Sequence, residues 1–421
     1  MEQTMSPALS MTRNDRPARF TSRWRSERAL DALTFFLADV ADGLGPFLVI
    51  DLTTRRGWSA ADAGFAMSML LLGTVLSQSF TGAWIDKTYH KRRSISIAAV
   101  IVAMCSVGIY FVPSETSVFA LQGITGVAVT IFPPAIAAIS LGLVGRQRLA
   151  ARAGRNEACF HAGNVTAAGI AIGLSWLWGT VGIFYGVAAM ALLSAISAQF
   201  INESDIDHEL ARGADRDEGD ESASIVPMTD LIQDRRIIWF TISVVLFHFA
   251  NAAMLPLVGQ KIGHAMDADR ASTFMAVCII VAQITMIPVA LLASRYAPQG
   301  RRAVFLVGFA VLPIRGVLYT MTDNSYALIA IQILDGVGAG IFGVAALLVM
   351  ADLTRGTGRF NFAQGIVATS IGLGAALSNY LTGIIVDHAG YNAGFLFLSS
   401  IAVVALAVFF TTVPETVRHS T

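Results

Sequence analysis

Two aspartates lie close together inside an otherwise apolar stretch of the chain. Asp39 and Asp42 stand three residues apart, in a run of about twenty mostly apolar residues that follows Arg28. On a helix, this spacing places both carboxylates on one face. Neighbouring carboxylates tend to share a proton, because one negative charge disfavours the other. We therefore expect Asp39 and Asp42 to bind and release protons; pairing with a cation, or solvation near the end of the run, is the alternative.

His248 and Asn251 form a second polar pair with the same spacing, in an apolar run of the second half of the chain. A histidine changes its charge near neutral pH, so His248 could relay protons or bind a solute. A buried histidine that is satisfied by a neighbouring carbonyl group is the alternative interpretation.

Arg315 and Asp335 carry opposite charges inside two consecutive apolar runs. If these runs are antiparallel neighbouring helices, the two side chains lie at similar depth, and we expect a structural ion pair. Binding of an anionic substrate by Arg315 is the alternative. Further polar side chains inside apolar runs are candidates for lining a substrate cavity, namely His161, Asn164, Gln283, Asn379 and Tyr380.

The elements that must position these residues are long and apolar. Of the 421 residues, 55% are hydrophobic and only 14% are charged, whereas a soluble domain carries about a quarter charged residues. A run of about twenty apolar residues is long enough to cross a bilayer as a helix. The sequence predicts an all-α membrane protein with twelve such helices, at 30–51, 62–85, 94–112, 118–144, 158–178, 180–201, 237–258, 272–294, 303–321, 326–350, 361–386 and 393–413.

The basic residues indicate how these helices are oriented. If the N-terminal tail lies inside, 24 of the 29 Lys and Arg residues lie on the inner side and Arg315 lies within a run. The outer loops hold only four, namely Arg55, Arg56, Lys261 and Arg270. Such an excess on one side marks the cytoplasmic face. We expect a multi-pass protein of the cell membrane (plasma or inner membrane), with cytoplasmic tails at 1–29 and 414–421.

The chain divides into two similar halves. Residues 202–236 are rich in charged residues and glycine and predict a flexible cytoplasmic linker between six-helix bundles at 30–201 and 237–413. Short segments recur in both halves at an offset of about 210 residues, for example Arg92-Arg93 with Arg301-Arg302. A duplicated six-helix unit with pseudo-symmetry is expected, in which His248 and Asn251 occupy the place that Asp39 and Asp42 have in the first half.

The loop after the second predicted helix carries a recognisable motif, Gly82-Ala83-Trp84-Ile85-Asp86-Lys87-Thr88-Tyr89-His90-Lys91-Arg92-Arg93. It resembles the loop between helices two and three of the major facilitator superfamily (MFS), in which a glycine, an aspartate with a basic neighbour and a basic cluster recur. The matching residues are Gly82, Asp86, Lys87, Lys91, Arg92 and Arg93. The loop departs from the family pattern at Tyr89, where a second glycine is usual.

This resemblance implies the MFS fold and a secondary transporter that works by alternating access. It also implies that the motif is a cytoplasmic gate, in which Asp86 pairs with the basic residues or with the N-terminus of a neighbouring helix. A positively charged inner loop without a gating role is the alternative. The corresponding loop of the second half has Arg295 in place of the aspartate, so the gate is expected on one side only.

Several classes of function are excluded by what the sequence lacks. It contains no nucleotide-binding loop, no Ser-His-Asp arrangement and no metal-ligand spacing. We therefore predict no enzymatic activity, no cofactor, no metal and no nucleic-acid partner. The partners expected are a small-molecule substrate, protons and the lipid bilayer, and the protein is expected to be a monomer.

The function that we predict is proton-coupled efflux of a small organic molecule, drug-like or metabolite-like. One alternative is a proton symporter or facilitator that imports an organic anion or a sugar-like solute. An alternative of another class is a membrane receptor or scaffold that transports nothing.

Overall fold

The structure is a computed structural model that describes residues 15–42, 44, 48, 51–112, 114–214, 225–263 and 268–417. Long α-helices dominate these ranges, and no strand occurs in them. The helices of the first half are α1 (Asp15–Asp42), α3 (Ala60–Lys87), α4 (Lys91–Phe111), α5 (Glu115–Val129), α6 (Phe132–Trp178) and α7 (Thr180–Gln199). Those of the second half are α10 (Arg235–Ala252), α11 (Met254–Gly263), α12 (Ala268–Tyr296), α13 (Arg301–Thr320), α14 (Ser325–Leu353) and α15 (Phe360–Thr412).

Nine helical segments of the described chain are long and apolar enough to cross a membrane. Two of them, Glu115–Trp178 and Phe360–Thr412, are far longer than one crossing requires. Each is interrupted by a glycine with positive φ, Gly145 at 73° and Gly390 at 81°, and the chain reverses its direction there. Dividing the two segments at these glycines gives eleven crossings, which leaves α1 as the one further crossing that the predicted count of twelve requires.

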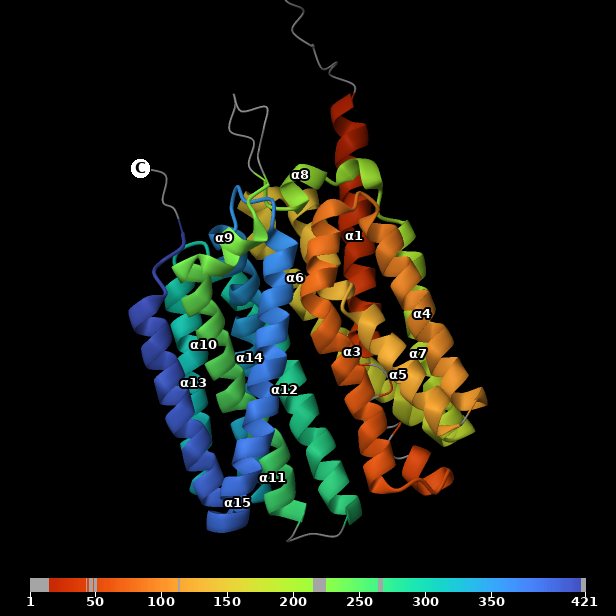
Figure 1. The fold of residues 1–421 in the computed structure, drawn as a ribbon, viewed down its shortest axis with the longest axis vertical. Helices are drawn as coiled ribbons and strands as arrows, with labels where there is room; N and C mark the ends of the chain where they lie inside the picture. The colour runs from red at the N-terminus through yellow and green to blue at the C-terminus, as the bar shows by residue number, and fades with distance from the viewer. Residues whose placement is uncertain are drawn as a thin grey trace, which may run out of the picture.

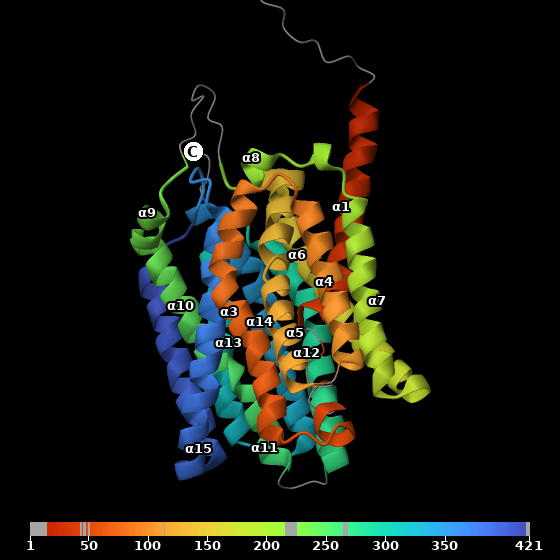
Figure 2. The same cartoon turned by 45° about the vertical axis from the view of Figure 1, so that its right-hand side comes forward.

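The helices form two bundles side by side (Figures 1 and 2). In the first bundle α1 packs on α6 and α7, and α4 packs on α5 and α7; in the second, α10 and α13 pack on α15, and α12 packs on α14. Contacts between the bundles are made chiefly by α6 with α12 and by α3 with α15. The fold class predicted from the sequence is therefore confirmed.

The duplication inferred from the sequence is visible at equivalent places in both bundles. After the last helix of the first bundle, the Glu203 carboxylate lies 3.0 Å from Arg92 Nε at the start of α4. After the last helix of the second bundle, the Glu415 carboxylate accepts the backbone N–H groups of Arg301 and Arg302, at 3.0 and 3.1 Å, at the start of α13. In each half a glutamate thus links the end of the last helix (α7 or α15) to the beginning of α4 or α13.

The segment expected to be a flexible linker contains local structure on both sides of its undescribed part. A 3₁₀ helix (η2, Glu203–Asp205) and two short α-helices, α8 (His208–Ala211) and α9 (Met228–Gln233), lie at one end of the bundles (Figure 1). We call this end the linker end and the opposite one, where the π-helix η1 (Asp51–Arg55) lies, the distal end. The linker is ordered here because its backbone binds the second bundle; for example, the Ala211 carbonyl accepts the side-chain amide of Asn361 at 3.0 Å.

The first helix also begins earlier than expected, at Asp15 within the predicted tail 1–29. Two serines explain how this extension docks: the hydroxyl groups of Ser22 and Ser26 donate to the Asp205 carboxylate, at 2.9 and 2.7 Å. Charged residues made this stretch look like a solvated tail in the sequence. Its contacts with η2 instead extend the helix beyond the end of the bundle.

Candidate functional site

The two bundles are joined at the linker end by one buried carboxylate. Asp86, at the end of α3 and 5% exposed, accepts the backbone N–H groups of Asn361 and Phe362 at 3.0 and 2.9 Å. It also accepts the side-chain amide of Asn361 at 2.8 Å. These N–H groups belong to the first turn of α15, where they have no partner within the helix, and the helix dipole favours a negative charge there. Of the two partners considered for Asp86, the structure places it against a helix N-terminus.

Gly82 makes this contact geometrically possible. A Cβ atom at this position would lie 2.2 Å from the carbonyl oxygen of Asn361, which is far inside van der Waals contact. A second glycine allows a similar close contact between α6 and α12: a Cβ atom at Gly154 of α6 would lie 2.4 Å from Ser294 of α12. Small residues therefore allow the bundles to approach backbone to backbone at the linker end.

The basic residues of the motif act within the first bundle. Lys91 is 1% exposed and donates to the Thr88 carbonyl at 2.7 Å, so it holds the turn between α3 and α4. Arg92 pairs with Glu203, whose pKa would be raised by burial but is lowered overall by the hydrogen bond and charge of Arg92. Lys87 and Arg93 lie exposed. Only Gly82 and Asp86 of the six motif residues lie at the contact with α15.

Arg315 and Asp335 form the expected ion pair, with Nη1 and Oδ1 2.6 Å apart. The Arg315 side chain is 1% exposed and also donates to Asn251 Oδ1 at 2.6 Å and to the Tyr319 hydroxyl at 2.9 Å. Gln332 donates to the same hydroxyl at 2.8 Å. The network joins α10, α13 and α14, so it positions helices of the second bundle, and Asn251 belongs to it.

His161 and Gln283 meet across the boundary between the bundles. His161 Nδ1 on α6 lies 2.6 Å from Gln283 Oε1 on α12. This contact engages Nδ1, so Nε2 is the ring nitrogen that faces away from Gln283. Nε2 is buried, makes no hydrogen bond with the residues that the structure describes, and lies 3.6 Å from the Glu157 carboxylate.

Glu157 is not among the residues predicted from the sequence, because it stands one residue before the apolar run 158–178. Its spacing of four from His161 places both side chains on one helical face, and this could have revealed it. The Glu157 side chain is 31% exposed and points at α14, since a Cβ atom at Gly343 would lie 2.5 Å from its carboxylate oxygen. A carboxylate and an imidazole therefore lie together against α12 and α14 of the other bundle.

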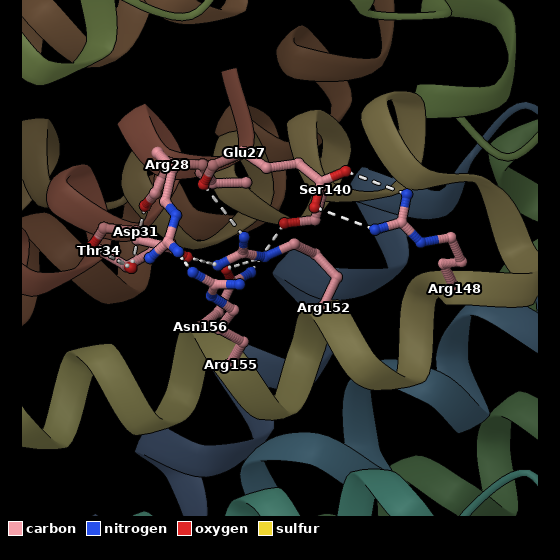
Figure 3. Close-up of polar contacts among 10 residues, drawn as sticks. Glu27, Arg28, Asp31, Thr34, Ser140, Arg148, Arg152, Arg155 and Asn156 are labelled. Atoms are coloured by element: carbon pink, nitrogen blue, oxygen red, sulfur yellow. Dashed lines mark hydrogen bonds and ion pairs between the residues drawn. The ribbon is translucent and has the colours of Figure 1, made fainter. Parts of the chain in front are cut away.

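A network of charged residues, on the linker-end side of this pair and not predicted from the sequence, fixes α6 against α1 (Figure 3). Arg152, with 2% of its side chain exposed, donates to Asp31 at 2.6 Å and to Asn156 at 2.8 Å, and Arg155 pairs with the other oxygen of Asp31. Asn156 in turn donates to Ser140 at 2.7 Å. Because Asn156 precedes Glu157 directly, this network sets the rotation of α6 that turns Glu157 and His161 towards the second bundle.

The remaining candidates lie apart from this pair. The ring of His248 packs edge-on against Phe342 at 4.6 Å, and its buried Nε2 has no hydrogen-bond partner among the described residues. Asn164 is partly buried, Asn379 donates to a carbonyl of its own helix, and Tyr380 is 69% exposed. The side chains of Asp39 and Asp42 lie outside the described residues.

Comparisons with known proteins agree with this architecture. The sequence profile of the Major Facilitator Superfamily matches residues 32–322 and 299–421. Two Mycobacterium tuberculosis proteins, each described as an uncharacterized MFS-type transporter and belonging to strains CDC 1551 and H37Rv, are 45% identical over 394 residues, which cover 93% of this chain and 94% of each relative.

Solved structures of low sequence identity share the fold. The MFS transporter FucP in its outward conformation superposes with a TM-score of 0.76 at 14% identity, over 93% of this chain and 100% of that one. The proton:xylose symporter XylE, bound to 6-bromo-6-deoxy-D-glucose, superposes with a TM-score of 0.71 at 14% identity, over 94% of this chain and 97% of that one.

Proposed function

The chain belongs to the major facilitator superfamily, and from that premise we propose that it exchanges protons for a small organic molecule and thereby exports it. Family membership makes it a multi-pass membrane transporter of small molecules, not an enzyme. Proton coupling and the direction of transport are our proposals. They rest on one observation: Glu157 and His161 lie together at the boundary between two bundles that must separate during transport.

Separation of the bundles changes the surroundings of this pair. In the arrangement closed at the linker end, Glu157 faces α14 and His161 binds Gln283. When the bundles part, the His161–Gln283 hydrogen bond breaks and both titratable side chains become hydrated. A group whose hydration differs between two states binds protons with different affinity in each, and this difference is what couples proton binding to conformation.

Loss of one proton from the pair leaves an uncompensated negative charge. We propose that the pair is neutral overall while the imidazole and the carboxylate hold a proton between them; when that proton leaves, the Glu157 charge has no partner. No other ion pair to Glu157 is found in the described ranges, and the two arginines that precede it on α6, Arg152 and Arg155, are bound to Asp31. Removing one partner of a buried pair costs about 3–5 kcal/mol, and the 31% exposure of Glu157 places this pair below that range.

This charge accounts for exchange better than for cotransport. The bundles close over the pair only when its charge is neutralised, either by a proton or by a cationic group of the solute. A site that accepts one or the other, but not both, moves them in opposite directions. We propose that the linker end is cytoplasmic, as the distribution of basic residues predicts, so that protons enter as the solute leaves. Asp39 and Asp42 are proposed to assist by binding protons near the distal half of α1, and the transporter is proposed to act as a monomer in the cell membrane.

The proposal is tested in everted membrane vesicles that hold an acidic lumen, with and without the protein. Candidate solutes are added outside while the pH gradient is followed. A solute that dissipates the gradient only in vesicles with the protein supports exchange. Solute movement in the same direction as the protons would show symport. A solute flux that does not depend on the pH gradient would show facilitation. Either result contradicts the proposal.

The role of the pair is tested with Glu157→Gln, which keeps the shape of the side chain and removes its titration. We expect loss of proton flux and of its pH dependence, while exchange of labelled for unlabelled solute persists. Glu115→Gln, which changes an exposed glutamate at the start of α5, serves as the control. If Glu157→Gln retains a normal pH profile and Asp39→Asn or Asp42→Asn abolishes it, the coupling site lies on α1 instead.

A further inference from the structure

A basic cavity lies at the linker end of the second bundle, away from the boundary between the bundles. Its volume is about 450 Å³, and it lies between the first turns of α10 and α13 and the last turn of α15. Three guanidinium groups line it, those of Arg235, Arg236 and Arg302, together with the aromatic rings of Trp239 and Phe410. Nothing in the transport mechanism above makes use of this cavity.

The cavity has an excess of positive charge. Arg236 is neutralised by Asp234, whose pKa is lowered by the hydrogen bond from Arg236, with the two side chains 2.7 Å apart. Arg235 forms no ion pair or side-chain hydrogen bond within the described ranges. Arg302 donates from one terminal nitrogen to the Phe410 carbonyl, while its Nε is buried and has no hydrogen-bond partner among the described residues. Two guanidinium groups therefore lack a carboxylate.

The nearby acidic residues are engaged elsewhere. The Glu415 carboxylate accepts backbone N–H groups at the start of α13, and Asp352 pairs with Arg301. Glu415 thus lies beside the backbone of Arg302, but neither carboxylate forms an ion pair with the side chain of Arg235 or Arg302 among the described residues. Arg302 uses one terminal nitrogen for the Phe410 carbonyl, so its guanidinium group still has a donor to offer to an incoming acceptor. Phosphate oxygens suit guanidinium groups especially well, because both offer several hydrogen bonds in one plane.

The apolar part of the cavity indicates which kind of phosphate fits. Phe410 is 56% exposed, Trp239 is 37% exposed, and the Arg302 guanidinium lies 4.9 Å from the centre of the Phe410 ring. Both rings belong to membrane-spanning segments near their linker ends, the level at which aromatic side chains meet lipid headgroups. A ligand that reaches both the guanidinium groups and these rings carries a phosphate next to an apolar chain.

We propose that this cavity binds the headgroup of an anionic phospholipid, with the phosphate between Arg235 and Arg302 and the first part of an acyl chain against Trp239 and Phe410. An anionic headgroup is preferred to a zwitterionic one because only one of the three guanidinium groups that line the cavity is paired with a carboxylate side chain among the described residues. Basic pockets between helices on the cytoplasmic side are a known way to recognise such lipids. The site is distinct from the Glu157–His161 pair and does not depend on the solute transported.

The test uses the purified full-length protein in mild detergent. Native mass spectrometry measures the lipid bound after titration with phosphatidylglycerol or with phosphatidylcholine, and thermal unfolding is followed in parallel. We expect phosphatidylglycerol to bind about tenfold or more tightly than phosphatidylcholine, and the preference to disappear in Arg235→Gln/Arg302→Gln, given about 1 kcal/mol for each basic residue near a headgroup.

Two controls make the outcome decisive. Arg295→Gln removes the same charge from an exposed position on the last turn of α12, outside the cavity, and should leave the preference intact. The single variant Arg235→Gln, at an exposed position, should weaken phosphatidylglycerol binding without loss of helical circular dichroism, which separates binding from folding. Equal binding of the two lipids, or an unchanged preference in the double variant, overturns the proposal. The proposal is also overturned if inorganic phosphate alone stabilises the protein against thermal unfolding as much as phosphatidylglycerol does. The ligand would then be a free phosphate.

Discussion

The substitution Asp86→Asn tests whether the contact of α3 with α15 holds the linker end closed. The asparagine side chain would keep the size of the aspartate but lose its negative charge. The three hydrogen bonds that reach the carboxylate, at 2.8, 2.9 and 3.0 Å, come from donors only. An amide presents one oxygen and one NH₂ group, so at least one backbone N–H of α15 would face another donor.

The magnitude follows from these contacts. Leaving a buried N–H unsatisfied costs about 1–3 kcal/mol, and loss of a charge at a helix N-terminus costs about 0.3–1 kcal/mol, or up to about 2 when partly buried. We expect the closed arrangement to lose about 3 kcal/mol relative to one in which α3 and α15 separate and water solvates both. Since 1.4 kcal/mol is a factor of about ten, the ratio of open to closed molecules should rise roughly 100-fold.

Pulsed electron paramagnetic resonance measures this population directly. Spin labels are placed at Tyr89 in the first bundle and Gln299 in the second, both exposed at the linker end, after the three native cysteines have been replaced by alanine. The unsubstituted protein in nanodiscs should give one short distance. A second, longer distance should appear in Asp86→Asn and account for a large fraction of the molecules.

Asp323→Asn is the matched control, because Asp323 is 85% exposed at the distal end and pairs with Lys261 within one bundle. It should leave the distance distribution unchanged. If Asp86→Asn gives the same single distance as the unsubstituted protein, the contact contributes less than the hydrogen bonds imply and the reasoning fails.

Two further substitutions probe the same architecture. Gly82→Val should favour the open arrangement even more than Asp86→Asn, because its Cβ would lie 2.2 Å from a backbone oxygen that cannot move alone; the same spin labels report it. Arg315→Met leaves the Asp335 carboxylate buried without its cation and should lower the free energy of unfolding by about 3–5 kcal/mol. Arg315→Met/Asp335→Leu should recover most of that loss in thermal unfolding. A double variant as unstable as the single one would contradict this view of the pair.

The helices and their grouping were predictable from the sequence for a physical reason. A chain in lipid must satisfy its backbone hydrogen bonds internally, so a long apolar run has almost no alternative to a helix. The predicted run 94–112 corresponds to α4 (Lys91–Phe111), and the run 180–201 corresponds to α7 (Thr180–Gln199). The ion pair of Arg315 with Asp335 was predictable as well, because two opposite charges at one depth in adjacent helices have few other partners.

The contacts between helices were decided only by the tertiary structure. Hydropathy does not distinguish a helical face that meets lipid from one that meets another helix, since both are apolar. The sequence therefore left open whether Asp86 binds its basic neighbours or a helix N-terminus, and the packing of α15 on α3 selected the N-terminus.

The same limit hid Glu157. Its place just before an apolar run resembles that of an ordinary boundary residue, and only the rotation of α6, held by Arg152 and Asp31, turns it towards α14. The amino-acid sequence was sufficient to predict two related bundles of membrane-spanning helices with basic loops on one side. Which polar groups face each other across the bundles depends on helix rotation and tilt, and these are set by side-chain packing between residues far apart in the chain.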